Sequence, residues 1–189
     1  MAQAQFKFEE GKQFTVIADE KTAEPEVKEF FSLLCGHCFQ FEPFMDSLQA
    51  ALPNGLKLEK SHVSYMPQND PEMQKTIVKA FLTMREMGKE KELVRQFFAA
   101  YHVQGVEFKM QDDIKKIFEA NDISGTQFDQ MMASSEITSK AKAMAALWEE
   151  KQIESVPTLV VNGKYRINMG TLKSLDEMKA ITLELLSKD

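Results

Sequence analysis

The chain of 189 residues is long enough for one packed domain, or for one domain that carries a second as an insertion. Its composition, 43% hydrophobic and 28% charged, is that of a globular protein and excludes the disordered and fibrous classes. No apolar run reaches the roughly 20 residues needed to span a bilayer. The net charge of -6 and the lack of a Lys/Arg cluster argue against nucleic acid as a partner.

Short apolar runs separated by polar turns open the chain. Residues 14–17 and 27–33 are rich in β-branched and aromatic side chains, so we predict a strand at each. Apolar residues then recur every three or four positions over 38–52, which predicts a helix facing a core. Pro43 within it should bend the helix without ending it. Alternation over 56–63 predicts a further strand.

The middle and the end of the chain differ in pattern. Residues 71–152 lack β-branched runs and carry apolar residues at helical spacing, so this section is expected to be all helix. Two apolar runs, 158–161 and 164–167, then flank Asn162-Gly163, which is the strongest short signal for a β-hairpin. A last amphipathic helix is predicted over about 174–187. The order favours an α/β domain interrupted by a helical block.

Cys35 and Cys38 are the only cysteines in the chain. A disulfide that encloses so short a loop stabilises little, so the pair is better explained by reactivity. A strand followed by C-x-x-C at the opening of a helix puts the first sulfur beside unsatisfied backbone N–H groups and the positive end of the helix dipole. We therefore predict Cys35 as the nucleophilic thiolate and the more enclosed Cys38 as the resolving thiol.

The two residues between the cysteines favour the same chemistry. Gly36 lets the backbone turn, and His37 can place positive charge near the Cys35 sulfur. Both effects lower the thiol pKa and stabilise the reduced form, which makes the disulfide a better oxidant.

Two other interpretations of the cysteine pair remain open. Half of a zinc site is one, but a closed zinc site needs four ligands, and the remaining histidines, His62 and His102, are isolated in the sequence. An inert buried pair is the other. We expect no metal.

A wider set of residues resembles a known family, the periplasmic thiol-disulfide oxidoreductases of the DsbA type. The resemblance covers nearly the whole chain and rests on Glu29-Phe30-Phe31-Ser32 before Cys35-Gly36-His37-Cys38, Gln40-Phe41-Glu42, Leu52-Pro53 with Gly55, Lys60, His62-Val63, Val156-Pro157 and Val161-Asn162-Gly163-Lys164-Tyr165. It implies an α/β, thioredoxin-like fold with an inserted all-helical domain. Residues 1–65 and 142–189 are then the two parts of the thioredoxin-like domain, and residues 66–141 are the insert.

The resemblance also implies a substrate site. Pro157 is expected to be cis and to face the disulfide, where the backbone of Val156 pairs with an extended substrate peptide. Met66 and Met169 fall in loops that flank the cysteines in the inferred topology, where flexible methionine side chains suit an adaptable groove.

Three charged residues are candidates for tuning the cysteines. Glu29 shares strand parity with apolar neighbours, so its carboxylate is expected to be buried and to relay a proton to or from Cys38. The alternative is a carboxylate at the end of the sheet that reaches water. Lys60 is a candidate to pair with Glu29, and Glu42 to tune the same cluster, while a solvated surface charge is an equally good interpretation of each.

The predicted function is oxidation of cysteine pairs in unfolded secreted proteins, with no bound cofactor. The resemblance implies a periplasmic location and reoxidation by a quinone-linked membrane partner of the DsbB type. Ala-Gln-Ala behind Met1 is read as the processed end of a mature form without its signal peptide. Because Gly36 stands where the family usually has proline, and Cys-Gly-His-Cys is typical of eukaryotic disulfide isomerases, a reductase or isomerase is the nearest alternative. A peptide-binding chaperone module without enzymatic activity is the other.

Overall fold

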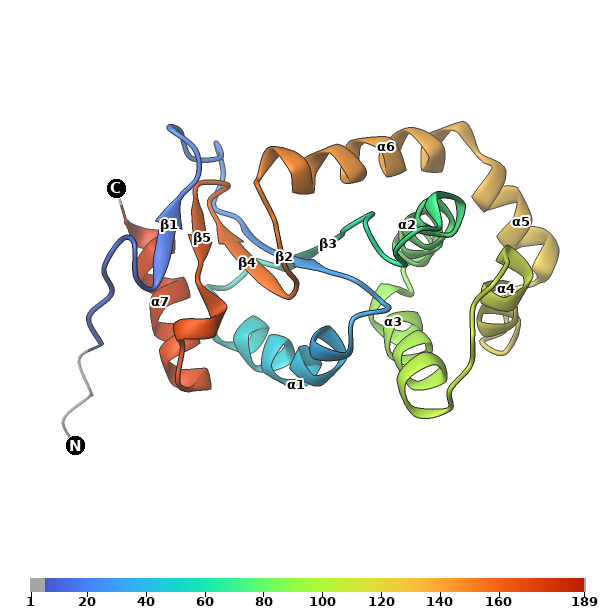
Figure 1. The fold of residues 1–189 in the computed structure, drawn as a ribbon, viewed down its shortest axis with the longest axis horizontal. Helices are drawn as coiled ribbons and strands as arrows, with labels where there is room; N and C mark the ends of the chain where they lie inside the picture. The colour runs from blue at the N-terminus through green and yellow to red at the C-terminus, as the bar shows by residue number, and fades with distance from the viewer. Residues whose placement is uncertain (1–5, 189) are drawn as a thin grey trace. The chain divides into compact units, whose positions relative to one another are not determined.

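The computed structural model describes residues 6–188, which divide into two compact units (Figure 1). The first unit contains the described residues up to Phe31, Gln40–Ser61, and the chain from Glu150 onward. The second contains Ser32–Phe39 and His62–Glu149. The second unit thus interrupts the first one in the sequence. The segment that carries the two cysteines, Ser32–Phe39, belongs to the second unit. The limits of 66 and 141 for the inserted domain stay a prediction.

A mixed five-stranded sheet forms the first unit, in the order β1-β5-β4-β2-β3. β1 pairs antiparallel with β5, β5 with β4, and β4 with β2. The strands are β1 (Phe14–Val16), β2 (Val27–Phe31), β3 (Leu58–His62), β4 (Thr158–Val161) and β5 (Tyr165–Ile167). All five predicted strands are therefore present, several of them shorter than their apolar runs.

The hairpin between β4 and β5 turns at Asn162 and Gly163, as the Asn-Gly pair predicts. Both residues have positive φ, 51° and 61°, which is the backbone that a tight hairpin turn requires. The buried Asn162 side chain accepts a hydrogen bond from the backbone N–H of Glu26 at 3.1 Å and donates to the carbonyl of Leu185 at 3.3 Å. This one side chain therefore ties the hairpin to the start of β2 and the end of the last helix.

Two helices cover one face of the sheet through a single apolar core. They are α1 (Gly36–Ala51) and α7 (Leu175–Ser187), and a short 3₁₀ turn, η2 (Met169–Thr171), precedes α7. The core joins Met45 and Leu48 of α1, Leu52 just after it, and Met178, Ile181 and Leu185 of α7 to side chains of β1, β2, β4 and β5. Pro43 lies inside α1 without ending it, and the bend expected there stays a prediction.

After β3, the described residues of the second unit form only helices and the loops that join them, as the sequence predicts. Its helices are α2 (Pro71–Glu86), α3 (Glu90–Phe98), α4 (Gln111–Glu119), α5 (Gly125–Ala133) and α6 (Ser135–Glu150), with a π-helical turn, η1 (Ala99–Val103), continuing α3. Asp70 accepts the N–H of Met73 to cap α2, and Pro71 occupies the first helical position, where its missing N–H costs nothing. Fully buried phenylalanines, among them Phe81, Phe97 and Phe118, fill the interior.

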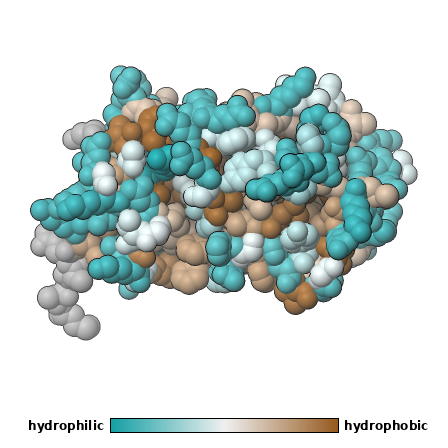
Figure 2. All heavy atoms as spheres, viewed as in Figure 1, coloured by the Kyte–Doolittle hydropathy of each residue, from teal (hydrophilic) through white to brown (hydrophobic). Residues whose placement is uncertain are grey.

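None of the described helices is both long enough and apolar enough to cross a membrane. The face drawn in Figure 2 is covered largely by hydrophilic residues, with hydrophobic ones in small groups.

Candidate active site

A hydrogen-bonded turn joins the end of β2 to the first cysteine. The backbone N–H of Cys35 donates to the carbonyl of Ser32 at 3.0 Å, and the N–H of Leu34 donates to the Ser32 hydroxyl at 3.2 Å. These bonds end the strand at Phe31, although the apolar run predicted that it continues to residue 33. The turn places Cys35 at the N-cap position, directly before the first residue of α1, Gly36.

The sulfur of Cys35 acts as the cap of α1. The backbone N–H of Cys38 donates to it at 3.3 Å, while the Cys35 carbonyl accepts the N–H of Phe39 at 3.1 Å. A side-chain acceptor at the N-cap satisfies an N–H group that has no partner within the helix. Cys35 is 8% exposed and Cys38 is fully buried, so the expected difference in enclosure is confirmed.

This environment lowers the pKa of the Cys35 thiol to about 6. The hydrogen bond from the Cys38 side chain lowers the pKa most; burial opposes it, and the backbone N–H groups of Cys38 and His37 and the His37 charge lower it further. The predicted helix terminus and His37 both contribute, but the partner thiol contributes more than either. With a pKa of about 6, thiolate outnumbers thiol roughly tenfold at pH 7.

A buried histidine holds the turn before Cys35. His62 Nε2 accepts the backbone N–H of Leu33 at 3.0 Å, and its Nδ1 lies 2.6 Å from the Val63 carbonyl, so the ring is the neutral tautomer with its proton on Nδ1. Burial lowers the pKa of His62 to about 4, against a smaller opposing effect of the Val63 carbonyl. The imidazole is therefore an uncharged acceptor at neutral pH.

A second histidine contacts the same residue from η1. His102 Nε2 lies 3.1 Å from the Leu33 carbonyl, and the His102 ring stacks on Phe39 with centroids 5.2 Å apart and planes 4° from parallel. The two histidines that looked isolated in the sequence are thus both engaged at Leu33. Among the described residues, no group of three or more His, Cys, Asp or Glu side chains could hold a metal ion.

In the first unit, a buried ion-pair cluster contains all three predicted tuning residues. Glu29 is fully buried, so the water-exposed alternative is wrong. Lys60 Nζ lies 2.5 Å from Glu29 Oε2 and 2.5 Å from Glu42 Oε1, and sits 4.8 Å from the centroid of the Phe31 ring. Burial alone would lower the pKa of Lys60, but the charges of Glu29 and Glu42 outweigh it and raise that pKa above its ordinary value.

The Val156–Pro157 peptide bond is cis, as the resemblance implies. Thr158, the next residue, pairs with Phe30 of β2, so Pro157 lies beside the end of the strand from which the chain runs on to Cys35. Pro157 and Met169 line one pocket of about 460 Å³ in the first unit, together with Ser155 and Arg166. That Pro157 faces the cysteines stays a prediction.

The remaining predicted substrate residues do not line that pocket. Val156 is half-buried and is not part of the lining. Met66 belongs to the second unit, where it precedes another cis proline, Pro67. Their contacts with a substrate stay predictions.

Comparison with known proteins identifies the family. The DSBA-like thioredoxin domain model matches residues 26–181. The chain belongs to the DsbA-like thioredoxin family. It is 30% identical over 166 residues to the thiol:disulfide interchange protein DsbA of Escherichia coli strain K12, covering 86% of this chain and 77% of the relative.

Other members of the family show the same likeness. DsbA of Pectobacterium carotovorum subsp. carotovorum is 31% identical over 165 residues, 85% of this chain and 77% of the relative. The crystal structure of DsbA from Klebsiella pneumoniae superimposes with a TM-score of 0.85 at 27% identity, covering 97% of this chain and all of that one. The predicted thioredoxin-like fold with a helical insert is confirmed.

Sequence reasoning also missed Tyr65, which lies close to the cysteines of this DsbA-like site. Burial raises the pKa of Tyr65 to about 12, and the negative charges of Cys38 and Cys35 add to the effect. Its ring packs edge-on against Trp148 at 5.1 Å, and the Trp148 indole N–H donates to the Ser64 hydroxyl at 2.9 Å. No sequence pattern around Tyr65 predicts that it lies near the cysteines.

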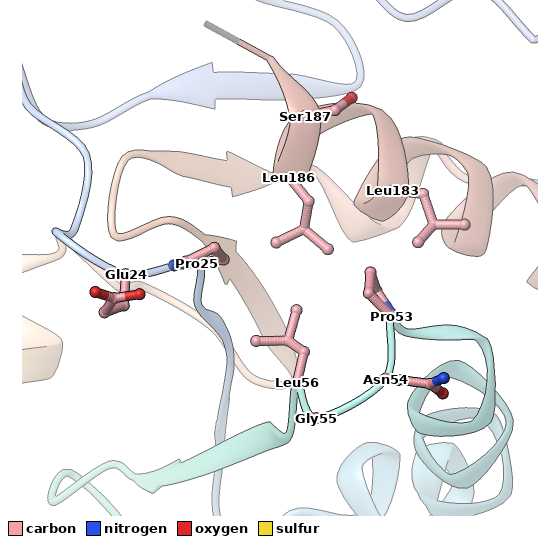
Figure 3. A pocket seen from close by; sticks show the side chains of 9 residues that line it. All are labelled: Glu24, Pro25, Pro53, Asn54, Gly55, Leu56, Leu183, Leu186 and Ser187. Carbon is pink, nitrogen blue, oxygen red and sulfur yellow. The ribbon is translucent and has the colours of Figure 1, made fainter.

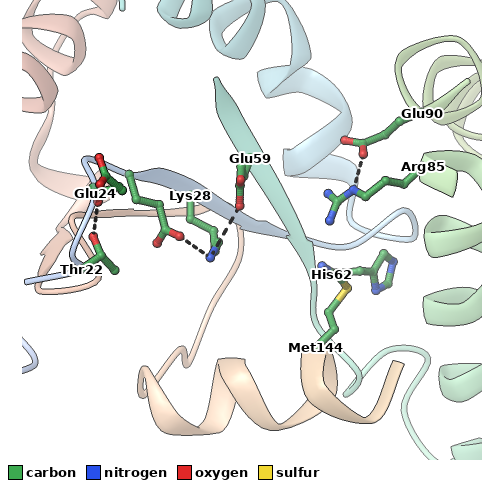
Figure 4. A network of polar contacts seen from close by, with 9 residues as sticks. Thr22, Glu24, Lys28, Glu59, His62, Arg85, Glu90 and Met144 are labelled. Atoms are coloured by element: carbon green, nitrogen blue, oxygen red, sulfur yellow. Dashed lines mark hydrogen bonds and ion pairs between the residues drawn. The ribbon is translucent and has the colours of Figure 1, made fainter. Parts of the chain in front are cut away.

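A second residue of α6, Met144, contacts the backbone of His62. The His62 N–H donates to the Met144 sulfur at 3.3 Å (Figure 4). Met144 and Trp148 are one helical turn apart on α6, so this single helix face supports the segment that carries His62 and Tyr65.

The first unit has a second pocket, which lacks thiol and imidazole groups. It measures about 510 Å³ and is formed by Pro53, Leu56, Leu183 and Leu186, with Glu24 at its edge (Figure 3). No cysteine or histidine lines this pocket, and both cysteines of the chain lie in the C-x-x-C segment.

Proposed function

We propose that this protein oxidises cysteine pairs in unfolded secreted proteins through a Cys35–Cys38 disulfide. It is a thiol-disulfide oxidoreductase by family, and its relatives are named thiol:disulfide interchange proteins. The observation that carries the proposal is the Cys35 sulfur at the start of α1, where it accepts the N–H of Cys38 and has a pKa of about 6.

The exchange proceeds in two balanced steps. A substrate thiolate attacks the Cys35 sulfur of the oxidised enzyme, a mixed disulfide forms, and Cys38 departs with the electron pair of the broken S–S bond. A second substrate thiolate then attacks the substrate sulfur of the mixed disulfide, and Cys35 departs as a thiolate. The substrate gains a disulfide and gives up two electrons, which remain on the two cysteines of the reduced enzyme.

The low pKa of Cys35 sets the direction of this exchange. A thiolate that is stable at neutral pH leaves readily from the mixed disulfide, and it stabilises the reduced enzyme against the oxidised one. Each 1.4 kcal/mol of that preference raises the potential of a two-electron couple by about 30 mV. Oxidation of substrates is therefore favoured over their reduction.

Glu29 is proposed to exchange a proton with Cys38. The buried Cys38 sulfur leaves as an anion in the first step and needs a proton, because burial disfavours the charged form. The proposal is supported by the fully buried carboxylate of Glu29 and by Lys60 and Glu42, which fix its position. Glu29→Gln is expected to slow substrate oxidation while leaving alkylation of Cys35 unchanged.

For the substrate we propose an extended peptide that pairs with the backbone of Val156 beside cis-Pro157, with Met66 and Met169 as adaptable contacts. The pocket lined by both Pro157 and Met169 supports the role of Met169 as a substrate contact. Met169→Ala is expected to raise the KM for a peptide dithiol, with no change in the pKa of Cys35. An unchanged KM would remove Met169 from the substrate site.

The proposed setting is the periplasm, where the mature protein would be reoxidised by a quinone-linked membrane protein of the DsbB type. Family membership supports this setting. Reduced protein mixed with vesicles that contain a DsbB-type protein and ubiquinone should become oxidised, whereas vesicles lacking the quinone should not oxidise it.

Two cysteine variants test the exchange itself. Cys38→Ser should accumulate a mixed disulfide with a reduced, unfolded substrate, detectable by mass spectrometry, and Cys35→Ser should neither trap nor oxidise substrate. Oxidation by Cys35→Ser at the wild-type rate would refute the proposal.

Two further measurements separate the alternatives. Equilibration with glutathione distinguishes an oxidase, which stays reduced until the buffer is strongly oxidising, from a reductase or isomerase. A chaperone module would bind unfolded peptide equally well after both cysteines had been alkylated.

A further inference from the structure

The carbonyl of Leu33, two residues before the nucleophile, has a side-chain hydrogen-bond donor in His102. A carbonyl oxygen only accepts hydrogen bonds, so the His102 Nε2 at 3.1 Å carries a proton and donates it. The N–H of the same residue is held by His62 at 3.0 Å. Leu33 is thus fixed on both its polar groups, and the hydrogen-bonded turn from Ser32 to Cys35 contains it.

Packing fixes the His102 ring in this orientation. It stacks on Phe39 of α1, and it also contacts the rings of Phe98 and Tyr101, with centroids 5.6 and 4.8 Å away. Histidine at this place therefore connects three elements: the turn before Cys35, the first turn of α1, and η1. A residue that only filled space would need the ring but not the donor.

The other nitrogen of the ring faces the start of α1. A Cβ built on Gly36 would lie 4.0 Å from His102 Nδ1, which is ordinary van der Waals contact. His102 therefore borders the residue that follows Cys35 as well as the residue two positions before it. The Cys35 backbone lies between these two points of contact.

We propose that His102 is a positioning residue for the redox site. Its hydrogen bond to Leu33 holds the turn before Cys35, so that the Cys35 sulfur stays aligned with the N–H of Cys38, and its stacking on Phe39 orients the ring that donates this bond. The inference rests on the proposed thiol exchange at Cys35, because the property that His102 adjusts is the reactivity of that sulfur. Loss of the donor should weaken the alignment and make the thiolate less stable.

Three substitutions at His102 separate the donor from the ring. His102→Gln keeps an N–H donor at about the reach of Nε2 but loses the ring. His102→Phe keeps the stacking ring and loses the donor, and His102→Asn loses the ring and carries an amide too short to reach Leu33. Val103→Ala is the matched control, because Val103 is the next residue of η1 and is 69% exposed.

The measurements are the pKa of Cys35 in the reduced protein, from thiolate absorbance in the ultraviolet, and the equilibrium constant with glutathione. His102→Phe and His102→Asn should raise the pKa by about 0.5 to 1 unit and make the protein about three- to tenfold less oxidising in that equilibrium. His102→Gln and Val103→Ala should match the wild type. Circular dichroism establishes that each variant is folded.

Two outcomes would overturn the inference. One is a wild-type pKa in both His102→Phe and His102→Asn, and the other is an equal shift in His102→Gln, which would show that the hydrogen bond is not the cause. Because thiol titration uses no substrate, the comparison holds even where the proposed oxidation of proteins fails.

Discussion

His62 accepts the backbone N–H of Leu33 through Nε2, 3.0 Å away, in a site with no exposed surface. The contact requires an unprotonated Nε2, because a protonated imidazole has no lone pair to accept with. Protonation of His62 therefore breaks the contact and places a charge in the interior. The structure thus links the turn before the active cysteine to pH.

We predict that the free energy of unfolding of the reduced protein falls between pH 6.5 and pH 4 because of His62. Its pKa is about 4 when folded and near 6.5 when unfolded, so in this window the unfolded state binds a proton that the folded state does not. Above pH 6.5 His62 causes no loss of stability, and as the pH falls from 6.5 to 4 the free energy of unfolding decreases by about 3 kcal/mol.

The His62 contribution is isolated by replacing the imidazole with an acceptor that does not titrate. Urea unfolding should show a shallower loss in His62→Gln than in the wild type over this range, since the amide oxygen still accepts the N–H of Leu33. Identical pH profiles for the two proteins would remove His62 as the cause.

Cys35 should react as a thiolate at neutral pH. The rate of iodoacetamide alkylation of the reduced protein is expected to be half-maximal near pH 6 and to level off above pH 7, in keeping with a pKa of about 6. Mass spectrometry should find the label on Cys35 and not on the fully buried Cys38. A rate that keeps rising to pH 9 would show an ordinary thiol.

Replacing Lys60 without replacing Glu29 is predicted to destabilise the protein. Lys60→Met leaves Glu29 buried without its cation and should lower the free energy of unfolding by about 3 to 5 kcal/mol. The double variant Lys60→Met with Glu29→Gln should regain most of that loss, because the buried charge is gone. Urea unfolding of the wild type, both single variants and the double variant gives the coupling energy, and a value near zero would contradict the ion pair.

The contrast between Glu29 and Lys60 shows what the sequence could predict. Burial of Glu29 follows from strand parity alone, since it shares a face with Val27, and the structure pairs it with Leu159 of β4. The pairing of Lys60 with Glu29 depends on β3 lying next to β2, which is a property of the whole sheet. The local sequence pattern therefore predicts the burial of Glu29 but does not decide whether Lys60 is paired or solvated.

His102 marks the limit of the same reasoning. The cysteines were identified because their motif is local: a strand, C-x-x-C and a helical pattern in one stretch of chain. His102 lies 69 residues from Leu33, and it reaches it from a π-helical turn, where the regular helical spacing is interrupted. Periodicity identifies the face of a regular helix, so it could not assign His102 to this site.

Two glycines provide a final prediction, because only one of them needs to be glycine. Gly163 has a φ of 61°, and a Cβ there would lie 2.9 Å from the Thr22 methyl group. Gly36 is exposed, its φ is not in the left-handed region, and an added Cβ would meet only His102 Nδ1 at 4.0 Å. Gly163→Ala should therefore lower the free energy of unfolding by about 1 to 2 kcal/mol.

Substitution of Gly36, in contrast, should not destabilise the protein. Gly36→Ala is expected to change stability by less than about 0.5 kcal/mol, and Gly36→Pro to raise it by up to about 1 kcal/mol, because proline suits the first position of a helix and restricts the unfolded chain. Thermal unfolding of the reduced proteins measures all three variants. A large loss in Gly36→Pro together with a neutral Gly36→Ala would mean that the N–H of Gly36, which proline lacks, is needed by the Cys35 thiolate.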